Sequence, residues 1–366
     1  MTARIDHPVD GDGVTADYLN RLLVLSGQTP CIADVVIEEA RTYGDQMVST
    51  AARVLFSVGY HEGQGIGWPT RLMLKIARTD DDVMAPFYDN EVAFYTRLRP
   101  ELDIEAPRCF GGDYDPETRR FALLLENLTA HDAHFPTVLE TISTERARSL
   151  LGTLARLHAR YWNVDVLGST LGWMGNALEG NVATLLNDAA APYILYEIGT
   201  QKFKNELVGM LGWSGEELRA GTKAMHHHQM RLDQCVVHGD THLGNTYFLP
   251  DGRCGLLDWQ LMGRGHPMHD VSYIIATALN IADRRVHEQD LLRYYLDQLA
   301  GLGAANPPSF EQAWAEYCRS MIWNVYVGWL TTPVVNYGWE INVMNHLRLV
   351  TAFEDLETGK LVRAVM

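Results

Sequence analysis

Three oxygen-bearing side chains stand at short, fixed spacings in the second half of the sequence. Asp240 follows the apolar run 235–237, and Asn245 comes five residues after Asp240. Asp258 follows a second apolar run, 254–257, and comes thirteen residues after Asn245. Short apolar runs that end in polar residues are typical of buried strands. We therefore expect the three side chains to meet at the end of a short hairpin.

Two carboxylates and one amide in this pattern fit phosphoryl transfer. That reaction needs an oriented hydroxyl and a metal ion that neutralises the charge of the triphosphate. Asp240 would accept a hydrogen bond, and then the proton, from the hydroxyl of the substrate. Asn245 and Asp258 would hold Mg²⁺, which takes few protein oxygens and completes its octahedron with water and phosphate.

The same segment also permits a different chemistry. His238, Asp240 and His242 form an H-x-D-x-H cluster, which could bind zinc in a metal-dependent hydrolase. No second histidine pair of comparable quality follows, and this alternative leaves Lys75, Glu91 and Asp258 unexplained. A catalytically silent nucleotide-binding scaffold is another alternative. The joint presence of Asp240, Asn245, Asp258 and Lys75 argues against it, because a silent protein has no physical need for all four residues.

The combination of His238-Gly239-Asp240, Asn245 and Asp258 resembles the signature of the aminoglycoside phosphotransferase and choline kinase superfamily. The resemblance runs from about Val36 to Tyr273. It implies a small-molecule kinase that uses ATP and Mg²⁺, with Asp240 catalytic and with Asn245 and Asp258 as metal ligands. Three further segments are similar to the ecdysteroid-kinase-like branch of that superfamily: 91–95, 154–162 and 258–260.

The resemblance also implies a nucleotide-binding set in the first third of the chain. Lys75 matches the phosphate-binding lysine of the third strand, and Glu91 matches the glutamate that pairs with it. Without the resemblance, these two residues could equally be separate surface charges. Glu126 and Leu128 belong to the segment that matches the hinge, whose backbone groups would contact adenine. Ser49 lies in the loop 43–49, which would cover the triphosphate.

Two residues near the motif are predicted to brace its loop rather than to react. Asp270 matches a family aspartate that holds backbone N–H groups of the catalytic loop. The alternative is that Asp270 caps a helix that starts near Val271. We also interpret His238 as a loop-bracing residue. His158 lies on an apolar helical face, where a hydrogen-bonded core histidine is the favoured interpretation.

Around these residues, the sequence predicts an α+β, protein-kinase-like bilobal fold. Residues 1–126 should form a small antiparallel-sheet lobe with one inserted helix, Ala85 to Leu98. Residues 127–366 should form a larger, mainly helical lobe that binds the acceptor. Its clearest helix begins at the capping box Ser309 to Gln312 and runs to about Trp329. The strands expected in the first lobe are 32–39, 51–60, 70–76, 107–111 and 120–125.

An aromatic stripe in the last hundred residues bears on the acceptor substrate. Aromatic side chains at helical spacing usually belong to a core. If some of these rings line the acceptor site, a bulky apolar or steroid-like alcohol is favoured, as the ecdysteroid-kinase resemblance also implies. The residues concerned are Trp323, Tyr326, Trp329, Tyr337 and Trp339.

Charge and composition exclude several other classes of protein. The chain of 366 residues has 46 acidic and 30 basic residues, for a net charge of −16. This excess disfavours nucleic acid and anionic membrane surfaces as partners. The resemblance implies ATP and a small-molecule alcohol as the partners instead. The five cysteines include no C-x-x-C pair, and no run of about 18 apolar residues occurs. We therefore expect a cytoplasmic protein.

Overall fold

The chain divides into two compact units. Unit 1 comprises Met1–Leu102 and Ala106–His134, and unit 2 comprises Asp103–Glu105 and Phe135–Met366. The computed structural model describes residues 5–41, 51–77, 85–163, 171–189, 191–330 and 332–366. Each unit encloses a core of its own apolar side chains.

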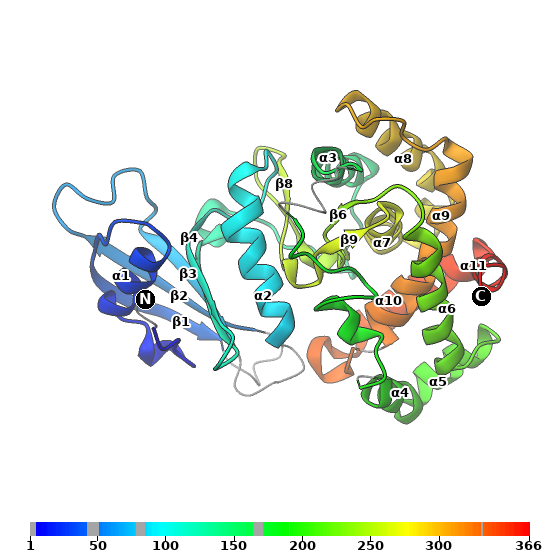
Figure 1. Ribbon diagram of the computed structural model, residues 1–366, viewed down its shortest axis with the longest axis horizontal. Helices are drawn as coiled ribbons and strands as arrows, with labels where there is room; N and C mark the ends of the chain where they lie inside the picture. Colours follow the sequence, from blue (N-terminus) through cyan, green and yellow to red (C-terminus); the bar gives the residue numbers. More distant parts are fainter. Residues whose placement is uncertain (1–4, 42–50, 78–84, 164–170, 190, 331) are drawn as a thin grey trace. The chain divides into compact units, whose positions relative to one another are not determined.

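Unit 1 is built on a five-stranded antiparallel sheet with the strand order β1-β2-β3-β5-β4 (Figure 1). Buried and less buried positions alternate along β2, because successive side chains of a strand point to opposite faces. β3 lies between β2 and β5 and is paired on both edges. A side chain on β3 is therefore held by regular backbone on either side. The strands are β1 (Ile32–Arg41), β2 (Ala51–Tyr60), β3 (Arg71–Ala77), β4 (Cys109–Asp115) and β5 (Arg120–Glu126).

Different helices cover the two faces of this sheet (Figure 1). On one face, α1 (Ala16–Leu25) inserts Leu22 and its neighbours into a core shared with the strands. On the other face lies α2 (Ala85–Ala93), where the ring of Tyr88 stacks on that of Phe121 with 4.5 Å between the ring centroids. Because α2 packs directly against the sheet, it can carry a side chain to β3.

Two predicted helices end in π-helical turns. α2 continues as η2 (Phe94–Leu98), and α9 (Phe310–Trp323) continues as η9 (Asn324–Leu330). The predicted helices, Ala85 to Leu98 and Ser309 to about Trp329, cover these segments, and their last turns are π-helical. The apolar spacing is similar in both helix types, so the sequence did not distinguish them. π-Helical turns are rare and are frequent at functional sites.

Unit 2 is mainly helical, and α7 (Met268–Ala278) is its central helix, since every one of its residues is buried. Across the described segments, no helix combines the length and the apolar character needed to cross a membrane. The other helices are α3 (Thr144–Arg160), α4 (Ala191–Thr200), α5 (Lys202–Met210), α6 (Gly215–Gln229), α8 (Ile281–Gly301), α9, α10 (Val334–Asp355) and α11 (Thr358–Arg363).

Two short antiparallel strand pairs complete unit 2. In the first pair, β6 (Cys235–Val237) lies beside β9 (Gly263–Gly265). In the second pair, β7 (Thr246–Phe248) lies beside β8 (Cys254–Leu256). The loop between β6 and β7 contains the predicted catalytic aspartate and a 3₁₀ turn, η7 (Leu243–Asn245).

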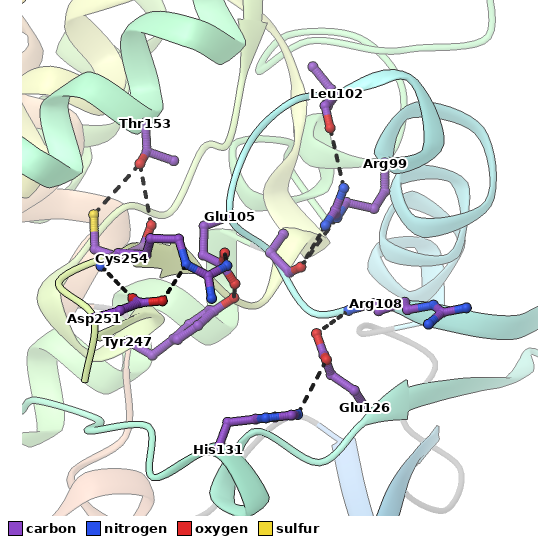
Figure 2. Close-up of polar contacts among 12 residues, drawn as sticks. Arg99, Leu102, Glu105, Arg108, Glu126, His131, Thr153, Tyr247, Asp251 and Cys254 are labelled. Carbon is purple, nitrogen blue, oxygen red and sulfur yellow. Dashed lines mark hydrogen bonds and ion pairs between the residues drawn. The ribbon is translucent and has the colours of Figure 1, made fainter. Parts of the chain in front are cut away.

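The fold-class prediction is confirmed, since an antiparallel sheet with one inserted helix precedes a mainly helical part. The predicted lobe boundary follows Glu126, whereas unit 1 extends to His134. Unit 2 also includes 103–105, and its polar contacts show why. Glu105 accepts a hydrogen bond from the Tyr247 hydroxyl at 2.7 Å and forms an ion pair with Arg253 at 2.5 Å (Figure 2).

Candidate active site

Lys75 and Glu91 form a buried ion pair within unit 1. The Lys75 Nζ atom on β3 lies 2.7 Å from both carboxylate oxygens of Glu91 on α2. Only 4% of Lys75 and 1% of Glu91 are exposed. A buried charge is costly unless an opposite charge compensates it, so each of these residues supports the other. Ser49, the other residue predicted to contact phosphate, lies outside the described residues.

The predicted hinge, 124–128, includes the end of β5, and its polar groups are partly used within unit 1. The Glu126 N–H donates to the Arg108 carbonyl at 2.9 Å, and the Glu126 carboxylate accepts the Arg108 N–H at 2.6 Å (Figure 2). The ring of His131 lies 3.7 Å from the same carboxylate. The Leu128 carbonyl accepts the N–H of Ala133 at 3.3 Å. The Glu126 N–H and the Leu128 carbonyl are therefore both engaged.

In unit 2, the loop after β6 turns sharply at a glycine. Gly239 has a φ of +86°, and a Cβ atom at this position would overlap the carbonyl group of Leu261. Glycine meets both conditions, because it tolerates positive φ and has no side chain. The turn leads from the buried strand to Asp240, whose side chain is 27% exposed.

Asp240 is held beside Asn245. The Asn245 Nδ2 atom donates to the Asp240 backbone carbonyl at 2.9 Å and to its Oδ2 atom at 3.0 Å. Burial and the nearby Asp258 charge raise the pKa of Asp240 to about 8, against the lowering effect of the hydrogen bond from Asn245. A carboxylate whose pKa lies near neutrality suits a general base.

The β7–β8 pair brings Asn245 and Asp258 to the same end. Asn245 directly precedes β7, and its carbonyl accepts the N–H of Leu257 at 2.8 Å, next to Asp258. The strand before Asp240 pairs elsewhere, with β9, so the expectation of a single hairpin is wrong. Asp258 adopts φ 60° and ψ 72°, in the left-handed region. Strain of this kind in a residue other than glycine concentrates at functional sites.

His238 forms hydrogen bonds with both segments that carry predicted site residues, the loop after β6 and the residues that follow β8. Its Nδ1 atom accepts the N–H of Asp240 at 3.2 Å, and its Nε2 atom donates to the carbonyl of Leu257 at 2.8 Å. Burial lowers the pKa of His238, in keeping with a neutral ring that has one donor and one acceptor nitrogen. The ring also packs on Trp259, with 4.4 Å between centroids.

Asp270 fixes the backbone of the loop after β6 by accepting hydrogen bonds from it. Its carboxylate accepts the N–H of His238 at 2.7 Å and the N–H of Gly239 at 2.9 Å. It also lies 3.1 Å from the Nε2 atom of His158. Burial would raise the pKa of Asp270, but the hydrogen bond and charge of His158, with smaller contributions, hold it below its usual value. An ionised Asp270 can therefore keep both N–H groups in place.

The alternative role for Asp270, as a helix cap, is wrong. α7 begins at Met268 after Pro267, which places Asp270 inside the first turn. Its carboxylate accepts N–H groups of the loop instead. His158 is fully buried and contacts the Tyr295 hydroxyl at 2.8 Å with its other nitrogen, so it is a hydrogen-bonded core histidine.

The geometry leaves the zinc alternative without support. Both nitrogens of His238 are engaged inside the loop, and the Nδ1 atom of His242 accepts the N–H of Gly244 at 3.1 Å. Within the described residues, no group of three or more histidine, cysteine, aspartate or glutamate side chains is arranged to hold a metal. Asn245 and Asp258 are only two residues, and asparagine is not one of these four types, so this absence does not bear on the predicted Mg²⁺ ligands. Mg²⁺ needs few protein ligands.

The aromatic stripe separates into core and surface residues. Trp323 and Tyr326 are fully buried and belong to the core. Tyr337 is half-buried, whereas Trp339 is 54% exposed. The side chain of Trp329 lies outside the described residues. Burial therefore removes Trp323 and Tyr326 from the residues that could contact an acceptor.

The structure groups most of the predicted residues within their own units. One group, in unit 1, contains Lys75 and Glu91. The other, in unit 2, contains Asp240, Asn245, Asp258, His238 and Asp270. Sequence reasoning missed His269, whose Nε2 atom donates to the Gly239 carbonyl at 3.0 Å. A buried helix conceals it, and the only signal was its position next to Asp270.

The sequence is similar to a family of enzymes over most of its length. A family model described as "Phosphotransferase enzyme family" matches residues 60–313. No curated protein matches the chain.

Solved structures of small-molecule kinases have a similar fold. A choline kinase from Cryptosporidium parvum Iowa II has a TM-score of 0.53 and 11% identity, over 91% of this chain and 91% of that chain. An ethanolamine kinase from Plasmodium vivax has a TM-score of 0.51 and 10% identity, over 88% of this chain and 83% of that chain. At these identities, the likeness shows a common fold.

Proposed function

Because the chain belongs to the phosphotransferase enzyme family, we propose that it transfers the γ-phosphoryl group of ATP to a hydroxyl of a small molecule, with Mg²⁺. The predictions of the superfamily and of a small-molecule phosphotransferase are confirmed by this membership. The ecdysteroid-kinase-like branch stays a prediction. One observation carries the proposal: Asn245 lies against Asp240, and the β7–β8 pair brings Asp258 to the same end.

Three side chains of unit 2, those of Asp240, Asn245 and Asp258, have different roles in the reaction. Asp240 accepts the hydrogen bond of the attacking hydroxyl and then its proton. Asn245 turns Nδ2 toward Asp240, which leaves its Oδ1 atom, with the carboxylate of Asp258, to hold Mg²⁺. Neighbouring carboxylates whose charges repel one another fit a hard divalent cation. When bound, the ion supplies charge neutralisation on the triphosphate.

Unit 1 supplies the groups that bind the nucleotide. Lys75 contacts phosphate oxygens while Glu91 fixes the direction of its side chain, as their 2.7 Å contacts support. Since the Glu126 N–H and the Leu128 carbonyl are engaged, the Glu126 carbonyl and the Leu128 N–H contact the edge of adenine. Ser49 contributes from the loop that covers the triphosphate.

The acceptor is a bulky apolar alcohol. Unit 2 exposes large aromatic side chains, which offer wide apolar area with polar tips. Tyr193 and Tyr196 on α4 are 73% and 70% exposed, and Trp339 on α10 is 54% exposed. Such rings suit a steroid-like or aromatic molecule better than a polycationic sugar.

Neither nucleic acid nor a membrane surface is a partner in this proposal. The net charge of −16 repels both kinds of polyanion. All five cysteines are free thiols, which suits a reducing cytoplasm. The partners are ATP and the alcohol.

A product screen tests the proposal. The purified chain is incubated with ATP, Mg²⁺ and acceptors from four classes: aminoglycosides, choline-like amino alcohols, steroids and phenolics. Phosphorylated products are detected by ³¹P NMR and mass spectrometry. We expect transfer to at least one alcohol, abolished by EDTA and strongly reduced in Asp240→Asn. Binding of ATP without transfer to any acceptor would instead support the silent scaffold.

A further inference from the structure

The peptide group between Gly239 and Asp240 sets the direction of the Asp240 side chain, because it fixes the backbone from which that side chain extends. Gly239 has a φ of +86°. Glycine tolerates a wider range of backbone dihedrals than other residues, so steric hindrance restrains this peptide group only weakly. Contacts from elsewhere in unit 2 are therefore needed to keep it in one orientation.

Two histidine side chains contact the two polar groups of this peptide. The N–H of Asp240 donates to the Nδ1 atom of His238 at 3.2 Å. The carbonyl of Gly239 lies 3.0 Å from the Nε2 atom of His269. Because a carbonyl oxygen can only accept a hydrogen bond, the Nε2 atom of His269 is the donor. The peptide group is thus held both at its N–H and at its C=O.

His269 and Asp270, adjacent on α7, contact the loop in complementary ways. The Asp270 carboxylate accepts the N–H groups of His238 and Gly239 at 2.7 and 2.9 Å. An ionised carboxylate has no proton to donate, so it cannot hold a carbonyl group. His269 supplies the missing donor. The first turn of α7 therefore binds both the N–H and the C=O of Gly239.

The ring of His269 is itself confined by other buried rings. Only 4% of His269 is exposed. Its ring lies 4.5 Å from that of Trp323 on α9 and 5.5 Å from that of His226 on α6, centroid to centroid. Burial lowers the pKa of His269, although the charge of Asp270 raises it, in keeping with a neutral ring that has one N–H group. The packing of two further helices thus limits the directions in which Nε2 can point.

We propose that His269 is a positioning residue for the catalytic loop: its Nε2–H group holds the Gly239 carbonyl and so fixes the direction in which Asp240 meets the acceptor. The inference rests on the proposed function. His269 acts through the backbone, one residue before Asp240. Its hydrogen bond therefore does not depend on bound metal or nucleotide.

A pair of substitutions at position 269 separates hydrogen-bond donation from packing. His269→Gln keeps an N–H donor at a similar distance from the backbone, whereas His269→Met has similar length and no donor. Both lose the ring. We expect kcat of His269→Met to fall roughly tenfold, with KM for ATP within about twofold of the wild type, because a buried carbonyl loses its donor. His269→Gln should keep most of kcat. Equal losses in the two variants would assign the effect to packing and overturn the inference.

His346 on α10 provides the matched control. Only 2% of His346 is exposed, and its Nδ1 atom donates to the Asn342 carbonyl at 2.6 Å. His346→Met therefore removes a buried contact of the same kind between a histidine and a backbone carbonyl. We expect it to lower stability and to leave kcat unchanged. A loss of kcat equal to that of His269→Met would overturn the inference.

Hydrogen exchange tests the contact without any acceptor. The amide of Asp240, followed by NMR, should exchange faster in His269→Met than in the wild type, because the peptide group is less restrained. His346→Met should leave that rate unchanged. If His269→Met does not fold, the ¹⁵N shift of the ring in the wild type decides, since Nε2 has to carry the proton. An unchanged exchange rate or an unprotonated Nε2 would overturn the inference. Absence of transfer by the wild type, with faster exchange in His269→Met, would overturn the proposed function instead.

Discussion

The charged groups of unit 1 and unit 2 are arranged in opposite ways. In unit 1, Lys75 and Glu91 face each other at 2.7 Å, so the buried positive and negative charges compensate. In unit 2, the charge of Asp258 acts on Asp240, and the two carboxylates repel each other. The first pair contributes to the stability of the folded unit, whereas the second costs stability until a proton or a cation binds.

This difference distinguishes residues that stabilise the folded chain from residues whose charges are compensated only when a ligand binds. A compensated pair can lose a partner only at the expense of folding. Repelling carboxylates can lose one member with a gain in stability and a loss of function, which is a common compromise at active sites. Substitution in the Lys75–Glu91 pair should therefore lower the stability of the protein. Substitution of Asp240 or Asp258 should instead raise stability and lower activity, and the following predictions test this difference.

The largest effect is expected for Asp240→Asn. The amide cannot accept the proton of the substrate hydroxyl, so phosphoryl transfer should fall by roughly 10² to 10⁴. The affinity for ATP, measured by calorimetry, should stay near that of the wild type. Asp251→Asn is the control, because Asp251 lies at the exposed turn between β7 and β8. Full activity of Asp240→Asn would refute the role of Asp240.

Glu91→Gln should destabilise the protein by roughly 3–5 kcal/mol, because it removes the charge that the buried Lys75 ammonium faces. The free energy of unfolding in urea measures this loss. Glu38→Gln is a control on the same sheet. Glu38 pairs with Arg71 of β3 at 2.7 Å, but the side chains are 30% and 47% exposed. That variant should lose far less stability, because exposed ion pairs contribute little. Equal losses would mean that burial of the Lys75 pair has no energetic consequence.

Asp258→Ala should weaken binding of the magnesium–nucleotide complex by at least about tenfold, because a predicted ligand is lost. Nucleotide binding measured with and without Mg²⁺ separates this effect from a general loss of affinity. We expect the variant and the wild type to bind metal-free nucleotide similarly. A defect of the same size without Mg²⁺ would contradict the assignment of Asp258 as a metal ligand.

The last prediction concerns the dependence of stability on pH. The pKa of Asp240 is raised to about 8 in the folded protein, so the folded state binds this proton more tightly than the unfolded state. The wild type should therefore lose stability as pH rises from about 4 to about 8. Asp240→Asn removes this loss, and its gain in Tm in metal-free buffer should grow over that range. A gain that does not vary with pH would argue against the raised pKa.

Much of the fold follows from local patterns in the sequence. The strand 51–60 was predicted with its observed bounds, since its apolar alternation is long and regular. The capping box at Ser309 is present, with both hydrogen bonds to Gln312. The π-helical turns could not be predicted, because they depend on a shift of backbone hydrogen bonds that no residue type specifies.

The candidate site was predictable where spacing alone determines geometry. A separation of five positions between Asp240 and Asn245 is enough for the amide to reach back to the carboxylate, as it does at 3.0 Å. The start of α7 at Met268 was missed, because Asp270 is a good capping residue in isolation and its long-range partner, the loop after β6, is not visible in local sequence. His269 was missed for the same reason, since its partner is the Gly239 carbonyl of that loop.

The two π-helical turns also affect how related sequences should be compared. A π turn accommodates one more residue than an α turn, and each helical residue advances the side-chain direction by about 100°. A relative that lacks the extra residue in 94–98 or in 324–330 would present a different face downstream, even with an identical apolar pattern. Alignments across these segments therefore need a one-residue gap at the turn, or every later helix position is matched to the wrong neighbour.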